Sequence, residues 1–187
     1  MEKRHFGIIA IIAISVFASR IIPHSPNFTA SLAGLIFGGA VLRKSIYAVL
    51  LVICYFLADL ILNNVNYASD HIGFQWTSQS FYWIYISLFL TFFISRIFTS
   101  KMENPFKIIG LSIGSSLIFY LLTNFGVWLE NLIYIKNTGG LIACFIAGLP
   151  FLLNELAGSL FFSCLFFGTY WLYESRQKRS SLTAEWR

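Results

Sequence analysis

Long apolar stretches separated by short polar segments run along the whole chain. They cover residues 6–22, 28–42, 45–62, 80–97, 108–129 and 139–173. A helix that crosses the hydrocarbon core of a bilayer needs about 20 mostly apolar residues. Most of these stretches are close to that length or longer. The pattern therefore predicts an all-α polytopic membrane protein, built as a six-helix transmembrane bundle.

Two of the stretches do not fit a simple span. The stretch at 28–42 is short, so it would cross the bilayer only by thinning it locally or by extending into the preceding loop. The stretch at 139–173 is too long for one straight span and too short for two spans with a loop. Pro150 lies inside it and either kinks the helix or ends a half-helix, because proline lacks a backbone N–H.

Most of the cationic residues fall in every second gap between the apolar stretches. These are Lys3, Arg4, Arg43, Lys44, Arg96, Lys101, Lys107, Arg176, Lys178 and Arg179. Basic loops stay on the cytoplasmic side of a membrane, so this distribution predicts that both termini are cytoplasmic. The opposite loops have no cationic excess and carry Arg20, His24, Asp70, His71, Glu130 and Lys136.

Composition agrees with this topology and narrows the function. The chain has 187 residues, of which 57% are hydrophobic and 11% are charged, whereas soluble domains contain about 25% charged residues. We expect one transmembrane helical domain over residues 1–175 and a polar cytoplasmic tail over 176–187. Topology and attraction to lipid headgroups explain the net charge of +5. Membrane lipid is therefore an expected partner and nucleic acid is not.

The sequence contains no pattern typical of a catalytic or cofactor site. It lacks a phosphate-binding loop, a dinucleotide fingerprint, a zinc-protease motif and a serine nucleophile elbow. We therefore predict no enzymatic activity, no cofactor and no metal site. Cys54, Cys144 and Cys164 all lie in apolar stretches without CxxC spacing, which favours buried structural thiols.

Small residues recur at four-residue spacing within the apolar stretches. The pairs are Gly34 and Gly38, Gly110 and Gly114, Ala143 and Ala147, and Ser15 and Ser19. Such pairs let helix backbones approach closely in lipid. They predict close packing inside the bundle, and the alternative is that one such face docks another membrane subunit.

Polar residues near the predicted outer ends of the helices form a candidate ligand site. Two prolines restrict the loop at 20–29, which carries Arg20, His24 and Asn27. Asp59 lies at about the level of Arg20, near the outer end of the third stretch. A carboxylate at that depth is costly unless it is paired or in contact with water. Asn124 lies near the outer end of the fifth stretch.

Two further polar residues follow Pro150 in the last apolar stretch. They are Asn154 and Glu155, and the carboxyl group of Glu155 should be neutral, paired or facing a cavity. We predict an outward-opening cavity with these two residues at its floor and the loop and helix-end residues along its walls. The structural alternative is a closed Arg20–Asp59 ion pair that only ties two helices together.

Several segments carry a resemblance to a known family. They are Arg20, Pro23–Thr29, Phe37–Ala40, Asp59-Leu60, Thr123–Trp128, Gly140-Leu141, Gly148–Phe151, Asn154 and Phe167-Gly168. These segments resemble DUF6580, a family of small bacterial integral membrane proteins of unassigned function. That family is similar in layout to the substrate-binding S components of energy-coupling-factor vitamin transporters. Those components have six helices and two cytoplasmic termini, and they bind a vitamin or related molecule near the outer face.

The resemblance implies a multi-pass protein of the bacterial inner membrane. Our first hypothesis is a small-molecule, vitamin-like uptake or binding protein of the S-component type. The alternative is an accessory or scaffold subunit of a larger inner-membrane complex. Either hypothesis admits other integral membrane subunits as partners, such as a transporter module.

Overall fold

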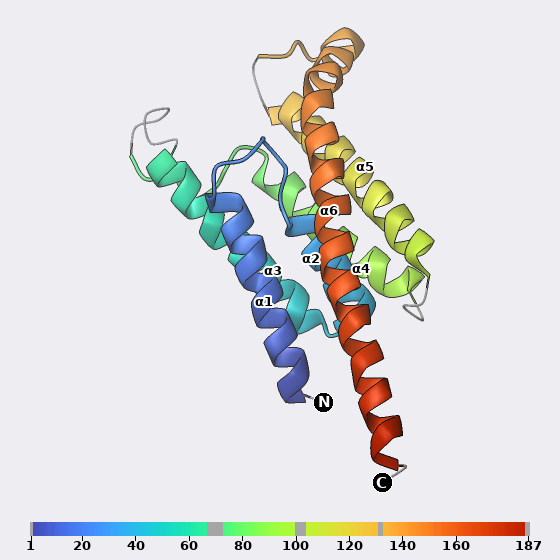
Figure 1. Ribbon diagram of the computed structural model, residues 1–187. Helices are drawn as coiled ribbons and strands as arrows, with labels where there is room; N and C mark the ends of the chain where they lie inside the picture. Colours follow the sequence, from blue (N-terminus) through green and yellow to red (C-terminus); the bar gives the residue numbers. More distant parts are fainter. Residues whose placement is uncertain (1, 67–72, 100–103, 131–132, 186–187) are drawn as a thin grey trace.

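The computed structural model describes residues 2–66, 73–99, 104–130 and 133–185. Within these ranges the chain forms six α-helices and no β-strand, arranged as the elongated bundle of Figure 1. The helices are α1 (Glu2–Ile21), α2 (Ser31–Phe37), α3 (Ser45–Ile61), α4 (Phe81–Phe98), α5 (Pro105–Glu130) and α6 (Thr138–Glu185). Two π-helical segments, η1 (Gly38–Leu42) and η2 (Leu62–Asn66), continue α2 and α3 directly. The all-helical prediction is confirmed.

Four helical segments are long and apolar enough to cross a membrane. They are Ser45–Asn66, Phe81–Phe98, Pro105–Glu130 and Thr138–Gln177. The apolar part of α1, Phe6–Ile21, and the combined segment Ser31–Leu42 are shorter. Length and composition therefore support a membrane protein with four candidate spans, against the six that the sequence predicts.

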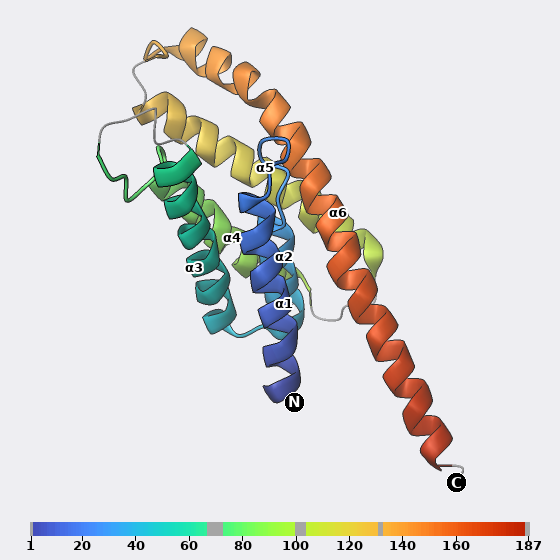
Figure 2. The same ribbon diagram turned by 60° about the vertical axis from the view of Figure 1, so that its left-hand side comes forward.

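The short helix α2 lies in the centre of the bundle. Its 7 residues and the 5 of η1 rise about 18 Å at 1.5 Å per residue, well short of a hydrocarbon core of about 30 Å. Every residue from Thr29 to Ala40 is buried, because α2 packs against each of the other five helices. The helix begins at Ser31, three residues later than the predicted Phe28, and the loop before it descends into the bundle (Figures 1 and 2).

Glycines allow this close packing around α2. A Cβ atom added to Gly34 would lie 2.8 Å from a methyl carbon of Val16 in α1. One added to Gly39 would lie 2.3 Å from the carbonyl oxygen of Phe92 in α4. Between helices in lipid, such van der Waals contact takes the place of the hydrophobic effect. The packing prediction for the glycines of this segment is confirmed.

The second glycine pair behaves differently. No atom lies within 4 Å of a Cβ placed on Gly110 or Gly114. Both line a groove of about 410 Å³ between α4 and α5. Ala143 and Ala147 are likewise exposed on α6. The prediction of packing inside the bundle is therefore wrong for these two pairs, because spacing alone does not reveal which way a helix face points.

The last apolar stretch forms a single helix. α6 has 48 residues and continues through Pro150, following a curved path in Figure 2. The alternative in which Pro150 ends a half-helix is therefore wrong. The helix also continues across the predicted domain boundary at residues 175 and 176, and its final turns extend beyond the other helices (Figure 1).

The two ends of the bundle differ in what they carry. Both termini lie at one end (Figure 1), which we call the terminal end, and the opposite end is called the loop end. At the terminal end, Arg43 donates a hydrogen bond to the carbonyl oxygen of Thr99, and Arg96 Nη1 donates to Ser45 Oγ at 3.0 Å. These bonds hold the turn between η1 and α3 against the end of α4. Asp70, His71 and Lys101 lie outside the described residues.

The three cysteines are free thiols in different environments. Cys144 is buried, Cys54 is half-buried and Cys164 is exposed on α6. The prediction of buried thiols is thus wrong for Cys164. An apolar stretch can place a residue toward lipid as readily as toward the core.

Candidate functional site

A cavity of about 410 Å³ lies at the loop end of the bundle. Its walls come from the end of α1, the loop at 22–29, α3 with η2, and the facing parts of α4 and α5. Many of the lining side chains are polar. They are Arg20, His24, Asn27, Thr29, Tyr55, Asp59, Asn63, Asn66, Ser78 and Thr123. Four of the seven predicted site residues are therefore brought together here: Arg20, His24, Asn27 and Asp59.

Three backbone N–H groups of the loop at 22–30 are hydrogen-bonded where the loop enters the bundle. Phe28 N donates to Ser25 O at 3.0 Å, and Thr29 N donates to Asn27 O at 2.9 Å. Ala30 N donates to Ser19 Oγ on α1 at 2.9 Å. Irregular backbone at membrane depth is tolerated only where it is buried in protein or lines a water-filled cavity. These bonds make the loop a defined wall of the cavity.

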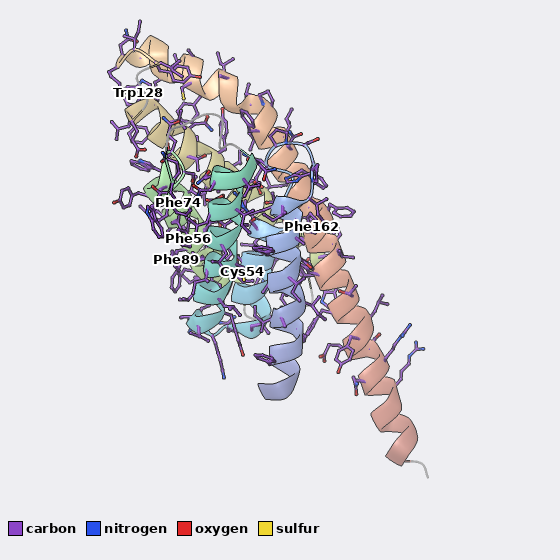
Figure 3. The ribbon with its side chains drawn as sticks, turned by 90° about the vertical axis from the view of Figure 1, so that its left-hand side faces the viewer. Cys54, Phe56, Phe74, Phe89, Trp128 and Phe162 are labelled. Atoms are coloured by element: carbon purple, nitrogen blue, oxygen red, sulfur yellow. The ribbon has the colours of Figure 1, made fainter. Side chains whose placement is uncertain are left out.

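Two features of the loop sequence fit this conformation. Asn27 has a φ of 66°, in the left-handed region that asparagine adopts more readily than most residues. Phe28 anchors the loop on α6, where its ring centroid lies 5.9 Å from that of Phe161 and 6.0 Å from that of Phe162. Figure 3 labels Phe162 beside the loop.

An ion pair closes one wall of the cavity. Arg20 Nη2 donates to Asp59 Oδ1, and Ser78 Oγ donates to Asp59 Oδ2 at 3.2 Å. The guanidinium carbon of Arg20 lies 3.7 Å from the ring centroid of Tyr55, an arrangement that favours a cation–π attraction. Asp59 is only 6% exposed. The predicted partnership of Arg20 and Asp59 is present and links α1 to α3.

His24 lies at the solvent-facing rim of the cavity. Its side chain is exposed, and its Nδ1 lies 2.5 Å from the carbonyl oxygen of Ile22. Because a carbonyl oxygen can only accept, Nδ1–H is the donor in this contact. The bond fixes the ring against the loop backbone at the mouth of the cavity.

Asn124 does not line the cavity. Its Nδ2 donates to the carbonyl oxygen of Tyr120 at 2.8 Å. Its amide lies against α6, where a Cβ added to Gly148 would be 2.2 Å from Asn124 Oδ1. The adjacent Thr123 lines the cavity in its place. The predicted position of Asn124 in the wall is thus wrong, because neighbouring residues on a helix point about 100° apart.

Asn154 and Glu155 also lie outside the cavity lining. Glu155 is 4% exposed, and its Oε1 has no hydrogen-bond partner among the described residues. It interacts electrostatically with Arg20 and Tyr55, which do line the cavity. One turn later on α6, a Cβ added to Gly158 would lie 2.9 Å from Thr29 N. Glu155 therefore sits behind the wall rather than at the floor of the cavity.

Sequence reasoning missed several lining residues. They are Tyr55, Asn63, Asn66, Ser78 and Thr123. The polar segment that follows the third apolar stretch was the available signal for most of them. Asn64 holds that segment in place, because its Nδ2 donates to Leu60 O at 2.9 Å and to Gln75 O at 2.8 Å.

The family model for DUF6580 matches residues 1–182. The chain belongs to this family. DUF6580 is described as a family of unknown function. No curated protein and no solved structure matches the chain, so the site must be interpreted from its own geometry. Amides, hydroxyls and a charged pair around a preformed cavity suit the binding of a small polar molecule.

Proposed function

We propose that this DUF6580 protein binds a small, vitamin-like molecule in the loop-end cavity and serves its uptake into bacteria in the manner of an S component. The observation that carries the proposal is a cavity of about 410 Å³ with polar walls in a bundle of apolar helices. Pockets of about 300–1,000 Å³ are typical for small ligands. Polar side chains inside a membrane protein are costly and commonly mark a ligand or ion path.

The basic residues support an outward-facing orientation for the cavity. Arg43, Arg96 and both termini share the terminal end, and basic segments favour the cytoplasm. The loop end would then face outward in the inner membrane, where a ligand arrives. The rigid loop and the Arg20–Asp59 pair would present a preformed site to it.

A cavity-filling variant tests the proposal. Thr123→Trp places a bulky ring in the cavity, whereas Leu121→Trp, two residues away on α5, adds the same ring at an exposed position. The protein is purified in mild detergent, and native mass spectrometry measures co-purifying small molecules. We expect Leu121→Trp to retain a molecule that the wild type carries and Thr123→Trp to lose it. A small molecule that neither variant loses would place the ligand elsewhere and reject this site.

A second function is favoured by the groove between α4 and α5. The open faces of Gly110 and Gly114 leave room for a close helix contact, as expected for an accessory or scaffold subunit of a larger membrane complex. Gly110→Leu would fill that groove. Under this alternative the wild type carries an integral membrane partner but no small molecule, and Gly110→Leu abolishes co-purification of that partner. Under the uptake proposal, Gly110→Leu retains the small molecule of the loop-end cavity.

A further inference from the structure

We propose that an anionic phospholipid binds in a second groove, between α1 and α6 at the terminal end, with an acyl chain in the groove and its phosphate at the basic helix ends. This site is separate from the loop-end cavity and does not depend on the proposed function. Its volume is about 410 Å³.

The two helices that form this groove do not close on each other. α1 packs mainly against α3, and Figure 2 shows α1 and α6 diverging toward the termini. Phe37 of α2 lines the groove between them. On α1, nothing lies within 4 Å of a Cβ placed on Gly7. The groove is therefore open to the outside of the bundle between α1 and α6.

The lining of the groove suits a hydrocarbon chain. Apart from Gly7 and Thr169 it consists of isoleucine, phenylalanine and tyrosine side chains. Thr169 Oγ1 donates to the carbonyl oxygen of Leu165 at 2.7 Å, within its own helix. Its hydroxyl hydrogen is thus already used. Flexible acyl chains fill such apolar surfaces without needing hydrogen-bond partners.

The charge at the mouth of the groove selects an anionic lipid. Lys3 and Arg4 lie one turn before Gly7 on α1. On α6, Arg176 follows Tyr173 by three residues and is exposed, which puts it on the groove side of the helix. In the sequence, the ends of both helices carry five cations, Lys3, Arg4, Arg176, Lys178 and Arg179, against three acids, Glu2, Glu174 and Glu185. Basic pockets between transmembrane helices bind acidic headgroups in this way.

A lipid accounts for both halves of the site better than a protein helix would. An apolar helix could fill the groove, but it offers no phosphate to the basic residues at the mouth. A phospholipid has an apolar chain and an anionic group next to each other in one molecule. The apolar groove and the basic helix ends likewise lie next to each other. Charge complementarity at this mouth therefore decides the occupant.

Native mass spectrometry with two defined lipids tests the proposal. The delipidated protein is titrated with phosphatidylglycerol and with phosphatidylcholine of the same acyl chains. We expect a saturable first binding event that favours phosphatidylglycerol by about tenfold. One cation near the headgroup contributes at most about a fivefold preference, so a tenfold preference requires two cations. Equal binding of the two lipids would overturn the proposal.

Two variants locate the site, and a third serves as control. Gly7→Leu fills the groove without a clash at its Cβ, and Gly110→Leu does the same in the α4–α5 groove. We expect Gly7→Leu to lose the first lipid and Gly110→Leu to keep it, at unchanged melting temperatures. Arg176→Gln should weaken the binding of phosphatidylglycerol by about fivefold and leave the binding of phosphatidylcholine unchanged. Equal behaviour of the two glycine variants, or a polypeptide cross-linked into the groove in place of lipid, would reject the lipid site.

Discussion

Around α2, glycines bring backbones together and leave no space, whereas at the loop end polar side chains hold backbones apart around a cavity. Gly39 sits directly against the carbonyl oxygen of Phe92. Above α2, the loop at 22–30 takes the place of the missing helical turns and supplies His24 and Asn27 to the cavity. The site therefore exists because α2 is short. A full-length second helix would have filled the volume where the loop now turns.

The largest effect is expected from filling the tight region. In Gly39→Leu the new Cβ would meet a backbone oxygen at 2.3 Å, and a backbone atom cannot move aside as a side chain can. Overpacking typically costs about 1–3 kcal/mol and occasionally more, and we expect this variant to exceed that range and fail to fold. The yield of folded protein after extraction in mild detergent measures this loss. Gly110→Leu, which meets nothing within 4 Å, is the control, and similar losses in both would mean that the two glycine faces do not differ.

Breaking the ion pair at the cavity should have the next largest effect. Arg20→Leu leaves Asp59 buried and unpaired, and removing one partner of a buried pair costs about 3–5 kcal/mol. The double variant Arg20→Leu/Asp59→Leu should recover most of the loss, because no lone charge remains. Unfolding in detergent gives both values. A loss below about 1 kcal/mol for the single variant would indicate a solvent-exposed pair.

A smaller effect of opposite sign is expected behind the cavity wall. Glu155 Oε1 is buried without a partner, and an unsatisfied buried polar atom costs about 1–3 kcal/mol. Glu155→Leu keeps a similar volume and removes that cost, so its melting temperature should rise. Ser163→Ala is a useful contrast, because Ser163 Oγ is hydrogen-bonded to Ser112 Oγ at 3.0 Å and its removal should lower stability. A fall in melting temperature for Glu155→Leu would show that the carboxyl group has a stabilising partner.

The sequence was sufficient for the elements and for part of the site. Hydrophobic stretches indicated each of the six helices, since apolar length is the dominant signal in such chains. The Arg20–Asp59 pair could also be predicted, because a charged side chain at membrane depth is costly unless an opposite charge at the same depth pairs with it.

The orientation of each helix about its own axis could not be predicted. Most residues of α5, and of α6 up to Tyr173, are apolar or small, so the hydrophobic pattern does not distinguish the core face from the outer face of either helix. For that reason the sequence predicts Asn124 in the cavity wall, where the structure has Thr123, and it predicts a packed interface at Gly114, where the structure has an open face. The continuity of α6 through Pro150 likewise could not be predicted, because a proline inside a long apolar stretch can either kink a helix or end it.

Thiol labelling from the aqueous phase measures whether the loop-end cavity opens outward and contains water. All three native cysteines are first replaced. Thr123→Cys then places a thiol in the cavity lining, and Ser116→Cys places one at a fully buried position about two turns away on α5. A membrane-impermeant methanethiosulfonate reagent is added to intact cells. We expect rapid modification at position 123 and none at position 116, because an outward-facing cavity contains water and the core near Ser116 does not. Protection of both positions, or modification of both, would contradict this expectation.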